Sequence, residues 1–309
     1  MGAKGGARGF LHGAFSPAAH PLRPNCDCQA ASDCMHFPGQ NPGWWSYDGM
    51  ADQYEAVAVP HYFAPVAEQL IADLQPARGS RLLDVGAGTA IVGSTVLRKC
   101  KNVRVVATDL SLMMLRKAKQ RGVPSVVADI GHQPFPSHCF DIVVASFVLN
   151  HLDDCAIAIV ELGHMLRPAG QLAVTSWARG PSENALGDVW NAIVSNWIDR
   201  EALRMAVNEA LPSEAELSEL AKLEAVLEDA GLPVTQSRVV ELPVQMTMAS
   251  YIESRCIAMA SRFMMAELPS YDWSAFRQEV TAALVARFGE SAVFGTKVNV
   301  VVAVRPMEV

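Results

Sequence analysis

The sequence predicts an α/β fold: a seven-stranded, mostly parallel sheet with helices on both faces and a helical lid formed by two insertions. Short apolar runs alternate with helical patterns between Arg81 and Trp177, as is typical of βαβ units and a parallel sheet. Two more apolar runs follow, each after a longer helical stretch. Half of the 309 residues are hydrophobic (50%), enough to build a sizeable core.

The alternation of strands and helices can be followed along the whole chain after the first helix. Ser213 and Glu216 have the spacing of a capping box, and Gly231 is suited to end the helix that they begin. Strands are expected over 81–85, 103–108, 125–128, 140–147, 170–177, 234–244 and 298–304. Helices are expected over 51–74, 91–98, 111–120, 154–166, 186–206, 213–230, 247–265 and 274–288.

The two long helical stretches interrupt the last third of the pattern. Insertions at these places fall at the carboxyl edge of the strands, where ligands bind in open α/β sheets, so we interpret them as one lid. The expected organisation is a flexible extension over 1–43, a Rossmann-like core over 44–180 and 213–246, lid insertions over 181–212 and 247–295, and a final strand with a tail over 296–309.

Charge and cysteine content narrow the class of protein. The net charge is −7 and Lys and Arg are not clustered, so a nucleic-acid partner is not expected. No apolar run is long enough for a membrane span. Seven cysteines, an odd number in a chain too large to need disulfides, indicate a reducing compartment, and we expect a cytoplasmic protein. The sequence indicates no oligomeric state.

The strongest functional signal lies at residues 82–89, where an apolar strand ending at Asp84 is followed by Gly86-Ala87-Gly88. Glycines let a ligand approach the main chain closely and present backbone N–H groups to it. A dinucleotide fingerprint would need a glycine at position 91, where Ile91 stands. An acid before the turn suits instead the α-ammonium group of S-adenosylmethionine, which we favour as the cofactor.

Two further acids follow the next two strands. Asp109 ends the second strand, where a carboxylate can accept both ribose hydroxyls of a nucleoside. Asp129 follows the third strand, where it can accept from the adenine amino group, with Ile130 against the base. Three acids in this order and spacing make the glycine turn a methyl-donor site rather than a nicotinamide site.

Residues 81–177 resemble the core of class I S-adenosylmethionine-dependent methyltransferases, in particular the small-molecule branch with the ubiquinone/menaquinone-biosynthesis C-methyltransferases. Pro134-Phe135-Pro136 before the fourth strand and Asn150-His151-Leu152 after it add to the resemblance. Ala90 stands where many members have a third glycine. The resemblance implies that the methionine part is held by Asp84, Gly86, Ala87 and Gly88 and covered by Tyr54, the ribose by Asp109 and Leu110, and the adenine by Asp129 and Ile130, with Ser146 along the cofactor.

Methyl transfer is an in-line displacement, so positioning supplies most of the catalysis, and a general base helps when the acceptor is a phenol, an amine or an acidic carbon. His151, just beyond the fourth strand, is the first candidate for that base. His61 and Tyr47, on the segment that usually borders the acceptor, are second candidates. Packing is the alternative role for each of the three.

The expected lid is rich in Trp and Met, which favours a small hydrophobic or aromatic acceptor methylated on O, N or C, in secondary or quinone-like metabolism. Residues 146–150 lack the Pro-containing motifs of enzymes that methylate macromolecules. Two alternatives stay open: a cofactor-bound enzyme catalysing another reaction such as a cyclisation, and a non-catalytic cofactor-binding protein.

One cluster lies outside this scheme. Cys26, Cys28, Cys34 and His36 would offer four N or S ligands to zinc. Their spacing matches none of the common structural zinc patterns, so we predict no metal site.

Overall fold

The computed structural model describes residues 43–179 and 185–307. These residues belong to one compact unit of the chain, Pro42–Val309. Cys26, Cys28, Cys34 and His36 lie outside the described residues, among which no group of His, Cys, Asp and Glu is placed to hold a metal ion. No helix in the described part of the chain is long and apolar enough to cross a membrane.

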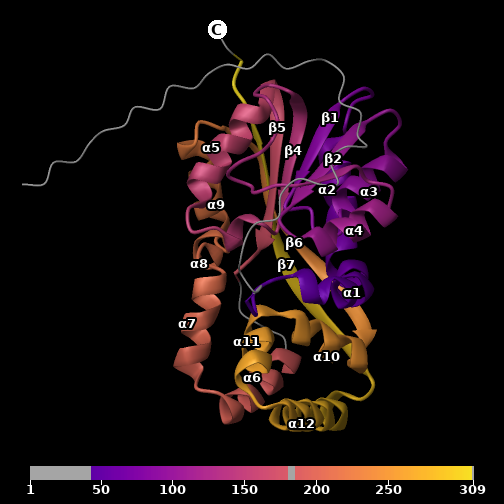
Figure 1. Cartoon of the computed structure of the whole chain (residues 1–309), viewed down its shortest axis with the longest axis vertical. Helices are drawn as coiled ribbons and strands as arrows, with labels where there is room; N and C mark the ends of the chain where they lie inside the picture. The colour runs from indigo at the N-terminus through magenta and orange to yellow at the C-terminus, as the bar shows by residue number, and fades with distance from the viewer. Residues whose placement is uncertain (1–42, 180–184, 308–309) are drawn as a thin grey trace, which may run out of the picture. The chain divides into compact units, whose positions relative to one another are not determined.

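A seven-stranded sheet with the order β3-β2-β1-β4-β5-β7-β6 forms the centre of this unit (Figure 1). The first five strands run parallel, whereas β7 is antiparallel to both β5 and β6. The predicted seven-stranded, mostly parallel sheet is therefore confirmed. The strands are β1 Arg81–Val85, β2 Arg104–Asp109, β3 Ser125–Val127, β4 Phe140–Ser146, β5 Leu166–Trp177, β6 Val234–Thr247 and β7 Ser291–Val304.

Helices cover both faces of the sheet, as predicted. The helices α2, α3 and α4 bury their apolar residues on one face together with Leu82 and Val144. The helices α5, α8 and α9 pack on the other face around Leu83 and Val143. Their bounds are α2 Ala64–Leu74, α3 Ile91–Lys99, α4 Leu112–Gln120, α5 Cys155–Met165, α8 Glu214–Leu217 and α9 Leu220–Asp229.

The last two strands are longer than predicted. β6 continues to Thr247 and β7 already begins at Ser291, inside the range expected for the second insertion. The strand continues because apolar and polar residues keep alternating, with Leu242, Val244 and Met246 buried between exposed neighbours.

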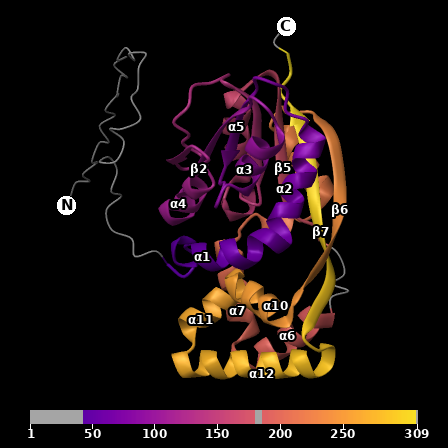
Figure 2. The same cartoon turned by 90° about the vertical axis from the view of Figure 1, so that its right-hand side faces the viewer.

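The extended ends of β6 and β7 carry a separate layer of helices (Figure 2). This layer has its own apolar core, which includes Trp190, Tyr251, Met264 and Phe276. Its helices are α6 Ala185–Trp197, α7 Arg200–Ala210, α10 Met248–Ile257, α11 Met259–Glu267 and α12 Ser270–Phe288.

Several predicted helices are broken by local hydrogen bonding. The helix expected over 186–206 ends at Trp197, because the Asp199 side chain accepts from the Ala202 N–H at 2.8 Å and starts α7. The capping box at Ser213 is wrong: its hydroxyl donates to the Leu152 carbonyl at 2.7 Å, and α8 stops at Leu217. The helix expected over 247–265 is interrupted at Ala258, whose backbone is extended.

The N-terminal helix contains a π-helical segment, Tyr54–Phe63, between α1 (Ala51–Gln53) and α2. Pro60 lies inside this segment and has no N–H for a helical hydrogen bond, and π-helical turns are common at functional sites. The segment crosses the carboxyl edge of the sheet, between the sheet and the layer of helices (Figure 2).

Candidate active site

The glycine turn after β1 has the open backbone that the sequence predicts. Gly86 and Gly88 adopt φ angles of 57° and 54°, which favour glycine. A Cβ on Gly86 would lie 2.1 Å from the Val148 side chain, whereas a Cβ on Gly88 would approach no atom closer than 3.9 Å. The main chain at Gly88 is therefore accessible to a ligand. Ala90 also has a positive φ of 54°, which explains why a third glycine would suit this position.

Asp109 holds this turn in place. Its Oδ2 atom accepts from the Gly88 N–H at 2.8 Å, and its Oδ1 atom accepts from the Ser111 N–H at 2.8 Å. Each carboxylate oxygen has a second lone pair, so both can still accept from ribose hydroxyls. Burial raises the pKa of Asp109, against the hydrogen bonds from Ser111 and Gly88. The residue fits the predicted ribose contact and also organises the turn.

Asp84 lies below the turn, with 1% of its surface exposed. Its Oδ2 atom accepts from the Gly93 N–H at 2.9 Å, which ties β1 to α3. Burial raises the pKa of Asp84 to about 7. This carboxylate has a role within the chain, and its contact with the cofactor's ammonium group stays a prediction.

The remaining predicted cofactor residues lie at or just beyond the carboxyl ends of β2, β3 and β4. Leu110 is 65% exposed beside Asp109. Asp129 accepts from the Gly131 N–H at 2.7 Å, and Ile130 is buried in the core. The Ser146 hydroxyl is 2.8 Å from the Thr175 hydroxyl on β5. Their contacts with a cofactor remain predictions.

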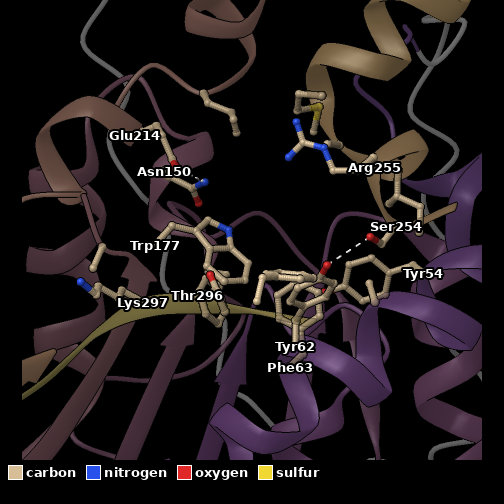
Figure 3. A pocket seen from close by; sticks show the side chains of 18 of the residues that line it. Tyr54, Tyr62, Phe63, Asn150, Trp177, Glu214, Ser254, Arg255, Thr296 and Lys297 are labelled. Carbon is tan, nitrogen blue, oxygen red and sulfur yellow. Dashed lines mark hydrogen bonds between the residues drawn. The ribbon is translucent and has the colours of Figure 1, made fainter. Parts of the chain in front are cut away.

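A cavity of about 660 Å³ opens where the π-helical segment meets the layer of helices (Figure 3). Of the predicted site residues, Tyr47, Tyr54 and His151 line it, and His61 does not. Tyr54 connects the cavity to the cofactor turn, because its hydroxyl is 3.9 Å from the place of a Cβ on Gly88. Charged side chains in the wall are Glu214, Glu241, Arg255 and Lys297.

Aromatic rings in contact form one wall of the cavity. Tyr54 stacks on Phe63 with ring centres 5.0 Å apart, and Phe63 meets the edge of Phe147 at 5.2 Å. Phe147 lies 4.5 Å from Trp177. Phe147 has a φ of 54°, a strained backbone for a bulky residue, so the fold holds this ring in place. Such a wall suits a planar, apolar ligand.

Two of the three predicted base candidates lie together. The His151 and Tyr47 rings meet edge to face, with centres 5.6 Å apart. Burial lowers the pKa of His151 to about 4, so its imidazole is neutral at pH 7 and has a nitrogen that can accept a proton. Burial raises the pKa of Tyr47 to about 12, so its hydroxyl stays protonated at pH 7 and orients a ligand by hydrogen bonding rather than acting as a base.

The structure adds a polar pair that sequence reasoning missed. Asn150 Nδ2 donates to Glu214 Oε2 at 2.7 Å, and both side chains line the cavity (Figure 3). Burial raises the pKa of Glu214, while the hydrogen bond from Asn150 lowers it. Asn150 was visible as part of the Asn150-His151 motif, but nothing in the sequence connects it to Glu214, 64 residues later.

Comparisons with known proteins agree with this geometry. Residues 83–174 match the family profile of a methyltransferase domain, and they contain the turn, Asp109, Asp129 and His151. The match ends before the layer of helices, so it says nothing about the residues that α6, α10 and α11 contribute.

Curated relatives of the methyltransferase domain cover only part of the chain. A demethylmenaquinone methyltransferase of Mycobacterium sp. (strain KMS) is 34% identical over 130 residues, 42% of this chain and 55% of that protein. A malonyl-acyl-carrier-protein O-methyltransferase of Halorhodospira halophila is 33% identical over 132 residues, 40% of this chain and 44% of that protein. The chain thus spans about half the length of the curated relatives it matches.

Solved structures share the fold over most of the chain. The 4+2 cyclase SpnF aligns with a TM-score of 0.55 at 18% identity, over 86% of this chain and 98% of that one. Phosphoethanolamine N-methyltransferase 2 of Haemonchus contortus, in complex with phosphomonomethylethanolamine and S-adenosylhomocysteine, aligns with a TM-score of 0.51 at 16% identity, over 84% of this chain and 58% of that one. At these identities the likeness shows the fold alone.

Proposed function

We propose that this chain binds S-adenosylmethionine at the turn after β1 and transfers its methyl group to an O, N or C atom of a small hydrophobic or aromatic acceptor in the cavity. The observation that carries the proposal is the position of Tyr54, which lies against Gly88 and also lines the cavity. The proposed methyl-donor site at the turn and the proposed acceptor site in the cavity therefore both border the Tyr54 side chain. The name of one of the two curated relatives, a demethylmenaquinone methyltransferase, supports a quinone-like acceptor.

The residues at the strand ends fit the proposed cofactor. Gly88 leaves the main chain open to the methionine part, and Asp109 keeps lone pairs for the ribose hydroxyls. When bound, the cofactor supplies an electrophilic methyl group on a sulfonium. We propose that Leu110, Asp129, Ile130 and Ser146 complete the nucleoside site and that Asp84 and Ala87 hold the methionine part.

Chemistry at the acceptor requires a held nucleophile and a place for its proton. The aromatic wall fixes a planar acceptor, and effective positioning contributes roughly 7–11 kcal/mol to lowering a bimolecular barrier. We propose that neutral His151 accepts the proton, with Tyr47 and Glu214 orienting the nucleophile. The helices α6, α7 and α10 to α12 act as the lid that excludes water from this site.

Product analysis tests this proposal. Purified protein is incubated with S-adenosylmethionine and candidate hydroxylated or aminated aromatic acceptors, and S-adenosylhomocysteine and methylated product are quantified together. One S-adenosylhomocysteine per methylated product is expected. The control is Asp109→Ala, which should lower turnover at cofactor concentrations that only just saturate the wild type.

A cyclisation or rearrangement without methyl transfer is the second candidate. The fold is shared with a protein named a 4+2 cyclase, so the fold itself does not choose between the two reactions. Acceptor turnover that needs the cofactor but forms no S-adenosylhomocysteine would favour this candidate. Cofactor binding without any turnover across the acceptors would favour a non-catalytic binding protein.

A further inference from the structure

The cavity wall contains three buried polar groups that make no hydrogen bond with any described residue: the Tyr251 hydroxyl, Arg255 Nε and Asn150 Oδ1. Tyr251 is 1% exposed and Asn150 is 7% exposed. An unpaired buried polar group destabilises a fold by roughly 1–3 kcal/mol, so such groups normally have a partner. Nine such atoms occur among the described residues, and these three belong to side chains that line one cavity, where a ligand with matching polar groups can supply their partners.

One side of the cavity offers hydrogen-bond donors from α10. The Arg255 guanidinium is held by stacking on the Trp190 ring, 5.4 Å from its centre, and forms no ion pair with a carboxylate of the described residues. Glu253, also on α10, is already paired with Arg277 of α12. The Tyr251 hydroxyl adds a second donor from the same helix. A cation and a hydroxyl side by side suit the oxygens of an anion.

Figure 3 shows that the Arg255 side chain extends toward the centre of the cavity, whereas the ammonium group of Lys297 points outward. Arg255 is therefore the cation that a ligand in the cavity meets. Tyr62 and Ser254, which are hydrogen-bonded to each other at 3.1 Å, lie beside it.

The opposite side of the cavity offers acceptors. Asn150 Nδ2 donates a hydrogen bond to Glu214, and the Oδ1 atom of Asn150 stays available to accept one from a ligand. His151 lies next in the chain and contacts Tyr47, which in turn contacts Tyr54 above the cofactor turn. A hydroxyl or amino group donating to Asn150 would thus lie at the end of the cavity nearer the proposed methyl donor.

We infer that the acceptor is an elongated aromatic acid with a carboxylate bound by Arg255 and Tyr251 and a hydroxyl or amino group held by Asn150 at the other end. The inference rests on the proposed function and narrows it to O- or N-methylation of an anionic acceptor. The aromatic wall of Phe63, Phe147 and Trp177 holds the ring between the two polar ends.

Calorimetry with three probes tests this inference: para-hydroxycinnamate, its methyl ester, and cinnamate. The first has both polar ends, the ester lacks the charge, and cinnamate lacks the hydroxyl. Para-hydroxycinnamate is expected to bind at least about tenfold more tightly than its ester, because the loss of one charge-assisted hydrogen bond lowers the affinity by about this factor. Arg255→Gln should reduce this ratio below about threefold, and Arg200→Gln, an exposed arginine of α7, should leave it unchanged.

Para-hydroxycinnamate should also bind more tightly than cinnamate in both the wild type and Arg255→Gln, because the Asn150 end is intact in both. Equal binding of acid and ester, no binding of the acid, or a preference that survives in Arg255→Gln overturns the inference. Binding of S-adenosylhomocysteine is measured in the same preparations. If it binds while the acid preference is absent, only the inference fails; if it does not bind, the proposed function fails.

Discussion

The buried carboxyl of Asp84 predicts that cofactor binding depends on pH. Burial raises the pKa of Asp84 to about 7, so at pH 6 most of the unliganded protein carries a proton there. A ligand whose ammonium group lies beside Asp84 binds more tightly to the protein when this carboxyl is ionised, because the two charges are opposite. Between pH 8 and pH 6 the ionised fraction falls about tenfold, and the affinity for S-adenosylhomocysteine should fall by the same factor.

Titration calorimetry at pH 6 and pH 8 measures this dependence. At pH 6, binding should release close to one proton, which is seen as a dependence of the observed enthalpy on the ionisation enthalpy of the buffer. Asp84→Asn keeps an oxygen for the Gly93 N–H and removes the titration, so its affinity should not change between the two pH values. A wild-type affinity that is equal at both, or an unchanged tenfold loss in Asp84→Asn, would refute this role of Asp84. His151, whose pKa is about 4, does not titrate in this range.

Three further predictions concern the turn and the base. Both Gly86→Ala and Gly88→Ala introduce backbone strain of roughly 1–2 kcal/mol, because both glycines have a positive φ. Gly86→Ala should lower the free energy of unfolding further, because only its Cβ clashes with Val148. Urea denaturation of the two variants measures the difference. Asp109→Asn should weaken S-adenosylhomocysteine binding at least about tenfold, and unchanged calorimetric affinity would remove the ribose contact. His151→Gln should lower kcat by about 10²–10⁴-fold with little change in cofactor affinity. Because the pKa of His151 is about 4, the kcat of the wild type should stay constant down to about pH 5. A normal kcat in His151→Gln would show that His151 is a packing residue.

The positions of the proposed cofactor-binding residues could be predicted from the sequence because their signals are local. Asp84, the Gly86–Gly88 turn and Asp109 lie at the ends of neighbouring apolar strands, and parallel strands bring their carboxyl ends to one edge. Even the departure at Ala90 has a local meaning, since that residue adopts a glycine-like φ of 54°.

The acceptor half could not be predicted in the same way because its residues come from distant parts of the chain. Glu214 was expected inside a helix that Ser213 would cap, but the Ser213 hydroxyl bonds to Leu152 and the neighbouring Glu214 lies beside Asn150. Arg255 falls within the helix expected over 247–265, and nothing in the sequence singles it out. The extension of β6 and β7 positions α10 over the cavity. The alternation of apolar and polar residues in β6 past Val244 was a usable signal of this extension.

His61 shows the limit of placing a residue by its neighbourhood in the sequence. It lies on the π-helical segment that borders the cavity, but Tyr62 and Phe63 line the cavity in its place. A helical face cannot be assigned from a 3.6-residue period where the winding is wider than that of an α-helix. The proline at position 60 was the available signal for this irregular winding.

A crystal structure of the protein with S-adenosylhomocysteine and para-hydroxycinnamate tests most directly that turn and cavity form one site. The nucleoside of S-adenosylhomocysteine should lie on Gly88 and Asp109, with the sulfur next to Tyr54. The sulfur should face the hydroxyl of the acceptor, which should lie beside Asn150 and His151. Nucleoside density away from Gly88 and Asp109, or a Tyr54 ring that separates the two ligands completely, would contradict methyl transfer in this cavity.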